Sequence, residues 1–209
     1  MLIDDSYHTI SSPAEGIYKE RGSRFIGLAF PISSADEVKA YLKEIKKAHH
    51  QANHHCYAFR SGPDGSVSRF SDDREPSGTA GKPILGQLQS AGLTDVLIIV
   101  ARYFGGSLLG VPGLINAYRS SAKDAIDHAT IIQKFVMVNF RITFGFQNQN
   151  ELITLLKSYS AIILKQDLSN DCFIDFQIRR GKADELTGKI KNIYHSNNHI
   201  LVSLLPVSN

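Results

Sequence analysis

The chain of 209 residues is long enough for one large domain or two small ones, and its 43% hydrophobic and 21% charged residues are ordinary for a globular protein. Its formal net charge of +3 lies in the last third of the sequence and is too small to indicate nucleic-acid binding by itself. The longest apolar run, residues 96–101, is much shorter than the roughly 20 residues of a membrane span. With two cysteines and no basic, apolar leader, we expect a cytoplasmic protein with reduced thiols and no membrane association.

The first 130 residues alternate between strand and helix patterns. Aromatic and β-branched residues predict a strand over 23–32, and apolar residues at helical spacing predict a helix over 33–49 that begins with a capping box of Ser34 and Glu37. The remaining predicted elements are strands over 54–60 and 94–103, a hairpin turn from the first of these into a strand near 67–70, and helices over 84–92 and 113–129. The strand over 94–103 is almost wholly apolar, so we expect both of its faces to be buried.

The pattern restarts near residue 131 and gives the order βαββαβ, which is the ferredoxin-like arrangement. The predicted elements are a strand over 133–144, a helix over 148–160, strands over 161–168 and 172–180 around a turn at Ser169-Asn170-Asp171, a helix over 182–195 and a strand over 199–205. No long linker separates the two halves. We therefore divide the chain into domains at residues 1–130 and 131–209.

A polar, glycine-containing run, "SDDREPSGTAGKPIL", occupies residues 71–85. It is not a nucleotide-binding P-loop, because Pro76 replaces the first glycine of that motif and Pro83 replaces the residue after the lysine. Gly78 and Gly81 let the backbone approach a ligand closely, and exposed amides there could hold an anion beside Lys82. The alternative is a solvated polar turn.

A second glycine-rich run, "RYFGGSLLGVPG", follows the apolar strand directly. A strand that leads into a glycine loop and then a helix places ligands at the end of the strand, where Arg102 lies. Tyr103 and Phe104 could stack on a base there or pack in the core, and for Phe104 we expect packing. We expect the two runs to face each other across an anion- or nucleic-acid-binding site. Its predicted residues are Ser77, Gly78, Thr79, Gly81, Lys82, Arg102, Tyr103, Gly105 and Gly106.

Candidate catalytic and metal-binding residues are fewer. Asp72, Asp73 and Glu75 could bind magnesium, and Asp72 or Asp73 could act as acid or base, which keeps an enzyme as an alternative. A His/Cys cluster over residues 49–56 has the composition of a zinc site, but alternation along a strand separates its members, and Cys56 is expected to be buried and inert. We predict no metal and no cofactor.

Four segments, "HHCYAFR", "RFSDDREPSGTAGKPIL", "GLTDVLIIVARYFGG" and "GLINAY", occur in the order and spacing of the IMPACT/YigZ family, which the chain resembles over about residues 15–128. The resemblance implies an α+β protein with a ribosomal-protein-like β-α-β domain, also found in elongation factor G. It implies the ferredoxin-like C-terminal domain of bacterial two-domain members as well. The family's glycine runs correspond here to residues 72, 73 and 75–82, and to residues 102–106 and 110.

The resemblance also implies a role. Eukaryotic relatives regulate translation by competing for the activator of an initiation-factor kinase, with the help of an extra N-terminal domain that we do not expect in this chain. For bacterial members, nucleic-acid binding is the usual suggestion. We therefore expect a non-enzymatic protein that binds RNA or a ribosome-associated protein and regulates translation, and that could dimerise through its ferredoxin-like sheet. An enzyme for a small phosphorylated substrate, with or without a metal, is the alternative.

Four positions depart from the family pattern. Leu108 and Asn116 stand where the family usually has a lysine and often an arginine, and Ala101 and Pro112 replace its usual threonine and glycine. The loss of two cations beside the predicted site should weaken its affinity for a phosphate backbone, because each such contact contributes through counterion release.

Overall fold

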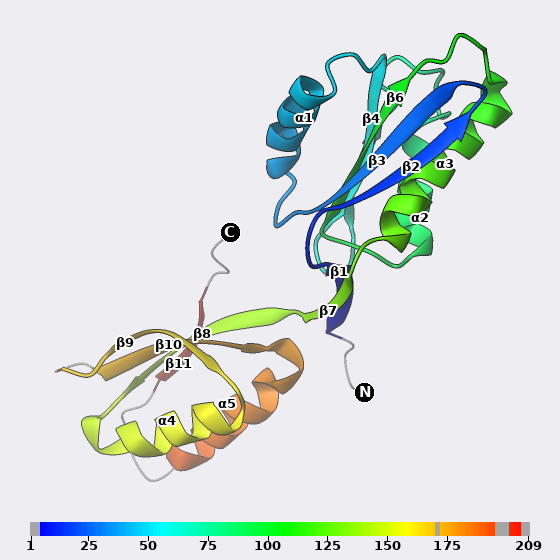
Figure 1. Cartoon of the computed structure of the whole chain (residues 1–209). Coiled ribbons are helices and arrows are strands. Elements are labelled where there is room, and N and C mark those ends of the chain that lie inside the picture. The colour runs from blue at the N-terminus through cyan, green and yellow to red at the C-terminus, as the bar shows by residue number, and fades with distance from the viewer. Residues whose placement is uncertain (1–4, 170–171, 195–200, 206–209) are drawn as a thin grey trace. The chain divides into compact units, whose positions relative to one another are not determined.

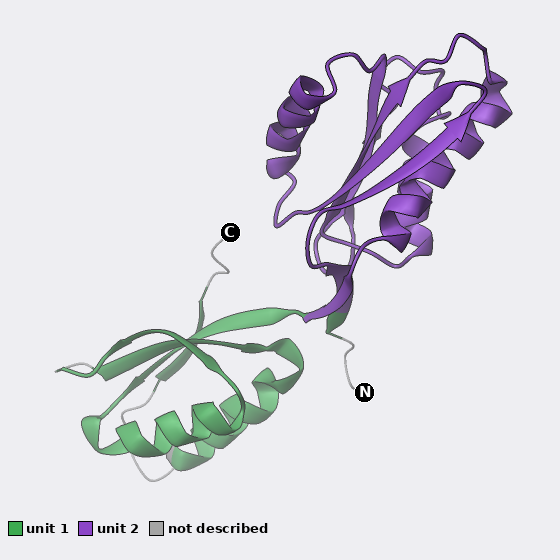
Figure 2. Ribbon diagram, viewed as in Figure 1, with its two compact units in different colours: residues 1–6, 135–209 green, residues 7–134 purple. Residues whose placement is uncertain are grey.

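The computed structural model describes residues 5–169, 172–194 and 201–205, and they form two compact units. One unit, which we call the first unit, is Tyr7–Lys134 (purple, unit 2 in the key of Figure 2). The other, which we call the second unit, combines Met1–Ser6 with Phe135–Asn209 (green, unit 1 in the key). The short strands β1 (Ser6–Ile10) and β7 (Ile131–Phe135) pair with each other where the chain passes from one unit to the other. Each unit has its own hydrophobic core.

The first unit is built on a five-stranded sheet with the order β2-β3-β6-β4-β5, in which all neighbours are antiparallel. Its strands are β2 (Ala14–Glu20), β3 (Ser23–Pro31), β4 (His54–Ser61), β5 (Val67–Ser71) and β6 (Val96–Tyr103). Helix α1 (Glu37–Ala48) covers one face, and α2 (Gly81–Ser90) and α3 (Gly110–Asp127) cover the other (Figure 1).

Strand β6 lies in the middle of this sheet and is buried on both faces, as its apolar sequence predicts. Ile98 and Val100 pack in the core beneath α2 and α3, whereas Leu97 and Ile99 pack in the core beneath α1. Because β6 is buried on both faces, we expect it to be rigid. Its last residues, which leave the sheet beside α3, are therefore held in place.

The second unit confirms the predicted ferredoxin-like fold. Its sheet has the order β11-β8-β10-β9, and both helices lie on one face of it (Figure 1). In chain order its elements are β8 (Met137–Phe144), η1 (Phe146–Asn148), α4 (Gln149–Ser158), β9 (Ile162–Asp167), β10 (Cys172–Arg179), α5 (Arg180–Tyr194) and β11 (Leu201–Leu205). Residues 170 and 171 of the predicted turn, and residues 199 and 200 at the start of the last predicted strand, lie outside the described residues.

The single strand predicted over 133–144 is wrong, because the structure divides it into β7 and β8 at Val136. The Val136 amide donates to the Asp5 carbonyl (2.7 Å), and its carbonyl accepts from the Arg180 amide (2.8 Å). Its backbone groups are thus satisfied outside both sheets. Strands β1 and β2, which the sequence did not predict, complete the architecture.

Only half of the predicted capping box is present. Helix α1 begins at Glu37, and its N-cap residue Asp36 makes no side-chain capping bond. The Glu37 carboxylate accepts hydrogen bonds from the amides of Ser33 (2.8 Å) and Ser34 (3.1 Å). The acidic side chain therefore reaches back as predicted, but the Ser34 hydroxyl is not the cap.

Two glycines let α3 lie directly on the sheet. A Cβ atom added at Gly16 would overlap the Ala125 backbone, and one added at Gly27 would overlap the Ser121 carbonyl. By contrast, a Cβ at Gly86 in α2 would meet no atom within 4 Å.

We predict that Gly27→Ala lowers the free energy of unfolding of the first unit by about 1–3 kcal/mol or more, because α3 must move away from β3. Gly86→Ala is the matched control and should be neutral or stabilising by up to about 1 kcal/mol, since alanine favours a helix interior. Hydrogen exchange of the β6 amides, measured by NMR, reports the stability of this unit. Equal effects of the two substitutions would contradict the close packing of α3.

Candidate binding site at the end of strand β6

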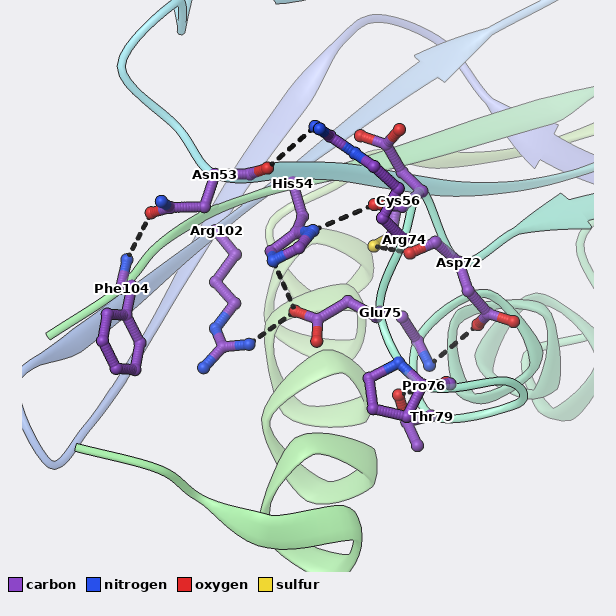
Figure 3. A network of polar contacts seen from close by, with 12 residues as sticks. Asn53, His54, Cys56, Asp72, Arg74, Glu75, Pro76, Thr79, Arg102 and Phe104 are labelled. Carbon is purple, nitrogen blue, oxygen red and sulfur yellow. Dashed lines mark hydrogen bonds and ion pairs between the residues drawn. The ribbon is translucent and has the colours of Figure 1, made fainter. Parts of the chain in front are cut away.

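The two glycine-containing runs meet at a buried ion pair. Arg102, at the end of β6, donates from Nη1 to Oε1 of Glu75 in the β5–α2 loop at 2.6 Å (Figure 3). The Tyr118 hydroxyl on α3 donates to the same oxygen at 2.7 Å. Only 7% of the Arg102 side chain and 3% of the Glu75 side chain are exposed. The pair thus joins a loop, a strand and a helix inside the first unit.

A second link between the runs passes through Asn53, just before β4. Its carbonyl accepts from the Arg74 guanidinium (3.3 Å), and its side-chain oxygen accepts from the Phe104 amide (2.9 Å; Figure 3). Asp73 and Arg74 are consecutive residues with positive φ angles of 38° and 72°. Such conformations cost about 1–3 kcal/mol each outside glycine and persist only where the surroundings fix them.

The amides of the first run do not form an open anion site, which corrects the expectation for Gly78 and Gly81. The Asp72 carboxylate already accepts from the amides of Gly78 (2.9 Å), Ala80 (3.1 Å) and Gly81 (2.8 Å). Because Gly81 begins α2, the positive end of that helix is neutralised by the chain's own carboxylate. Lys82 is exposed beside this internal anion.

The other predicted residues divide between packing and exposure. The Gly105 amide donates to the Ser23 hydroxyl (3.1 Å), and the Thr79 hydroxyl donates to the Pro76 carbonyl (2.7 Å). Ser77 and Gly106 are exposed, and Gly106 has a φ of 87°. Of the nine predicted residues, only Arg102 and Tyr103 line either of the two hollows described next.

The first hollow, which we call the β6 pocket, has a volume of about 480 Å³. One part of its lining is polar and contains the Glu75–Arg102 pair, and another part is apolar and comes from the β6–α3 loop and the start of α3. Its lining residues are Asn53, His54, Arg74, Glu75, Pro76, Arg102, Phe104, Leu108, Leu109, Gly110, Val111 and Leu114. Both glycine-containing runs therefore contribute to it.

His54 brings a titratable group to this pocket. Its Nδ1 lies 2.9 Å from the Asp73 carbonyl, which can only accept, so Nδ1 carries the proton and Nε2 faces Glu75 at 3.7 Å. His55 points to the other side of the strand, where its Nε2 lies 3.1 Å from the His49 carbonyl. Burial lowers the pKa of His55, which favours the neutral ring. As predicted, alternation along β4 places His54 and His55 on opposite sides of the strand.

Cys56 lies beneath the pocket and is inert. It is fully buried, and its thiol contacts the Tyr118 hydroxyl (3.3 Å) and the Asp72 carbonyl (3.0 Å). Burial raises the pKa of this thiol far above its usual value, and it raises the pKa of the Tyr118 phenol in the same way. Neither group can supply a nucleophile near neutral pH.

A second hollow, of about 530 Å³, lies at the turn between β2 and β3, and we call it the β2–β3 pocket. Its lining residues are Lys19, Glu20, Arg21, Gly22, Ser23, Arg24 and Tyr103. The Arg24 guanidinium lies 4.6 Å from the centre of the Tyr103 ring. Sequence reasoning missed these cations because it did not predict β2. The sequence signal that could have revealed them is the dipeptide Arg21-Gly22. It forms a two-residue loop with positive φ angles of 44° and 78°, as is typical of a tight hairpin.

The two positions that lack the family's usual cations differ in environment. Leu108 is 83% exposed at the rim of the β6 pocket. Asn116 donates from its side-chain amide to the Tyr18 hydroxyl at 3.1 Å. The first change therefore replaces a charge by exposed apolar surface, and the second by a neutral hydrogen bond.

Two kinds of site are not found in the part of the chain that the structure describes. No group of three or more His, Cys, Asp or Glu side chains is placed to hold a metal ion. No helix among the described residues is long and apolar enough to cross a membrane.

Comparison with known proteins identifies relatives of the whole chain. The family model of the Impact N-terminal domain matches residues 21–126. The IMPACT family member YigZ of Escherichia coli (strain K12) is 30% identical over 188 residues, which cover 89% of this chain and 92% of the relative. The crystal structure of a protein described only as hypothetical superposes with a TM-score of 0.73 at 28% identity, over 99% of this chain and 100% of the other. A structure of the two-domain translational regulator Yih1 matches 58% of this chain and 47% of its own at 25% identity, with a TM-score of only 0.35.

We predict that Glu75→Gln lowers the free energy of unfolding of the first unit by about 3–5 kcal/mol, because it leaves the Arg102 charge buried without its partner. The double variant Glu75→Leu/Arg102→Met should recover most of this loss, since two apolar side chains replace both charges. Urea denaturation followed by hydrogen exchange of the β6 amides measures both. Glu44→Gln, on the exposed face of α1, removes a carboxylate without changing stability by more than about 0.5 kcal/mol. A loss below 1 kcal/mol in Glu75→Gln would mean that the ion pair does not hold the loop.

Proposed function

The chain belongs to the IMPACT family, and from this premise we propose that it is a non-enzymatic cytoplasmic protein that binds single-stranded RNA and acts in the regulation of translation. The observation that carries the proposal is the pair of neighbouring aromatic residues at the end of β6. Tyr103 lines the β2–β3 pocket and Phe104 lines the β6 pocket. Each ring has an arginine beside it, with Arg24 at 4.6 Å from Tyr103 and Arg102 at 5.6 Å from Phe104.

Aromatic rings with adjacent cations suit single-stranded nucleic acid. Every base has a flat face that can stack on an aromatic side chain, and such stacking contributes about 1–3 kcal/mol per base. Phe104 is 46% exposed and therefore offers its ring to a ligand. The bases of double-stranded RNA could not stack on these rings, because they are already stacked on each other.

The exposed cations around the two pockets supply the electrostatic part of the binding. Lys19, Arg21 and Arg24 are exposed at the β2–β3 pocket, and Arg74 is exposed at the β6 pocket. Their attraction for phosphates does not depend on base sequence and weakens as salt rises. Because Arg102 is buried and paired with Glu75, it does not belong to this phosphate-tracking set.

The second unit has a comparable group on the open face of its sheet. The Phe173 ring on β10 lies 4.4 Å from the Arg141 guanidinium, which is also paired with Asp175 (2.6 Å), and 5.6 Å from the Lys165 ammonium. We include this face in the proposed RNA-binding surface, as a site of its own. The sheet edges β9 and β11 carry exposed apolar residues, Ile162 and Leu204 among them, and a homodimer would form by pairing such edges.

The metal-dependent enzyme is less well supported. The carboxylates of its candidate ligands already accept hydrogen bonds from backbone amides. Asp72 accepts from three of them, and Asp73 accepts from the amide of His55 (2.7 Å). A carboxylate held in this way has few lone pairs left for an ion.

We predict that the full chain binds a 12-nucleotide oligouridine with an affinity that falls steeply between 50 and 200 mM salt. Phe104→Ala should weaken this binding by a factor of about 5 to 100, through the loss of one stacked base. The double variant Lys19→Ala/Arg24→Ala should reduce the slope of log affinity against log salt by about 1–2. Fluorescence anisotropy measures all three quantities.

Lys39→Ala on the exposed face of α1 is the control, because it removes one charge without touching either pocket. Binding that ignores salt, or that Lys39→Ala weakens as much as Phe104→Ala does, would refute the proposed surface.

A further inference from the structure

Arg102 uses only part of its hydrogen-bonding capacity. Its Nη1 donates to Glu75, but its Nε is buried and has no hydrogen-bond partner within the described chain. Arg102 as a whole is only 5% exposed. Figure 3 shows one guanidinium nitrogen directed at Glu75 and the other two turned away from it. A buried donor without a partner is destabilising and calls for an explanation, of which a missing ligand is one.

The unused edge has a defined shape. In the planar guanidinium group, the Nε–H and Nη2–H bonds point in parallel from the same edge. This pair of donors, which we call the fork, matches the two oxygens of a carboxylate. The bond to Glu75 and the Phe25 ring, at 5.4 Å from the guanidinium carbon, fix the orientation of the group. Arg102 is therefore oriented before any ligand binds.

The charges around the fork favour a further anion. Glu75 neutralises Arg102, but Arg74 also lines the β6 pocket and adds one positive charge. The charged lining residues are Arg74, Arg102 and Glu75, so the net charge of the pocket lining is +1.

Helix α3 begins in the same pocket and has no side-chain cap. Its N-cap residue is Leu109, and Leu109, Gly110 and Val111 all line the pocket. The first amides of a helix lack partners within the helix and favour negative charge. At the start of α2 the Asp72 carboxylate meets this need, whereas at the start of α3 no side chain does so.

The rest of the pocket is apolar. Phe104, Leu108 and Val111 are 46%, 83% and 52% exposed, and Leu114 lies deeper at 6%. Exposed apolar side chains that gather around one hollow of this size are typical of ligand sites. A phosphate ion or a ribose would leave that surface uncovered, so the ligand needs an apolar group next to its charge.

We propose that the β6 pocket binds a carboxylate attached to an apolar group. The carboxylate pairs with the Nε and Nη2 edge of Arg102 and approaches the first turn of α3, and the apolar group covers Phe104, Leu108 and Val111. Two sources share this chemistry: a free aromatic or aliphatic acid, and the C-terminus of a polypeptide that ends in an apolar residue. The inference goes beyond the proposed RNA binding: the acid and an RNA base would compete for Phe104, but RNA has no carboxylate to pair with Arg102.

The test is an NMR titration of the full, isotope-labelled chain with 3-phenylpropionate, and with 3-phenylpropanamide as the uncharged match. We expect saturable shifts at the Arg102 Nε–H and at residues 104–111, and an affinity for the acid at least about tenfold above that for the amide. Absence of saturable binding, or equal affinities for acid and amide, overturns the proposal. Equal binding of uridine monophosphate overturns it as well and assigns the pocket to RNA.

Peptides distinguish the two sources. A pentapeptide that ends in phenylalanine is titrated with a free and with an amidated C-terminus. An affinity for the free peptide more than about tenfold above that for 3-phenylpropionate identifies a polypeptide C-terminus as the ligand. An equal or lower affinity identifies the free acid. A preference for the amidated peptide contradicts the assigned role of Arg102.

Matched valine variants keep the test independent of Arg102, whose replacement could unfold the unit. Val111→Ser in the pocket should weaken 3-phenylpropionate binding about three- to tenfold, because apolar contact is lost. Val67→Ser on β5, at a valine of similar exposure (47%) outside the pocket, should leave it unchanged. Arg102→Lys, in a protein that retains its NMR spectrum, should weaken binding at least about tenfold by removing the fork. Equal effects of the two valine substitutions would refute the pocket as the binding site.

Discussion

The buried pair of Glu75 and Arg102 is the interaction on which the site depends. It joins the β5–α2 loop to β6, and the Tyr118 hydroxyl extends it to α3. Neither charge can leave its partner without being stranded away from water, which is far more costly than losing an exposed ion pair. The polar wall of the β6 pocket is therefore rigid. A loop rich in glycine and proline, which in isolation would sample many conformations, is held in one by its contacts.

The polar residues of that loop mostly face inward. Asp72 closes the start of α2, Asp73 binds the His55 amide, and Glu75 binds Arg102. Three carboxylates that look like candidates for metal binding or catalysis thus serve as internal partners for amides and a guanidinium. The loop therefore affects a ligand only indirectly, by orienting Arg102 and the neighbouring Arg74 side chain.

Sequence predicted those features that a local pattern or the family resemblance carries. The apolar run of β6, the ferredoxin-like order of the second half and the approach of the two runs all follow from local pattern and family resemblance. The break at Val136 did not, because its hydrogen bonds go to Asp5 and Arg180, which are distant in the chain. The hydrogen bonds from the amides at the start of α2 to the Asp72 carboxylate were not predicted either. A sequence shows that a carboxylate is nearby, but not which donors it will bind. The β2–β3 pocket was missed with β2 itself, because the burial of that strand alternates but its residue types do not: Gly16 is buried, whereas Ile17 is 47% exposed.

Leu108 shows how one position can change the chemistry of such a site without changing the fold. It is 83% exposed, so its side chain contributes little to the core and its replacement costs the fold little. A lysine at this position would place a cation at the rim of the β6 pocket and favour phosphates. Leucine instead extends the apolar surface formed by Phe104 and Val111. The buried arginine is unaffected by this exchange, so an anion is still required, but the group attached to it must now be one that water solvates poorly.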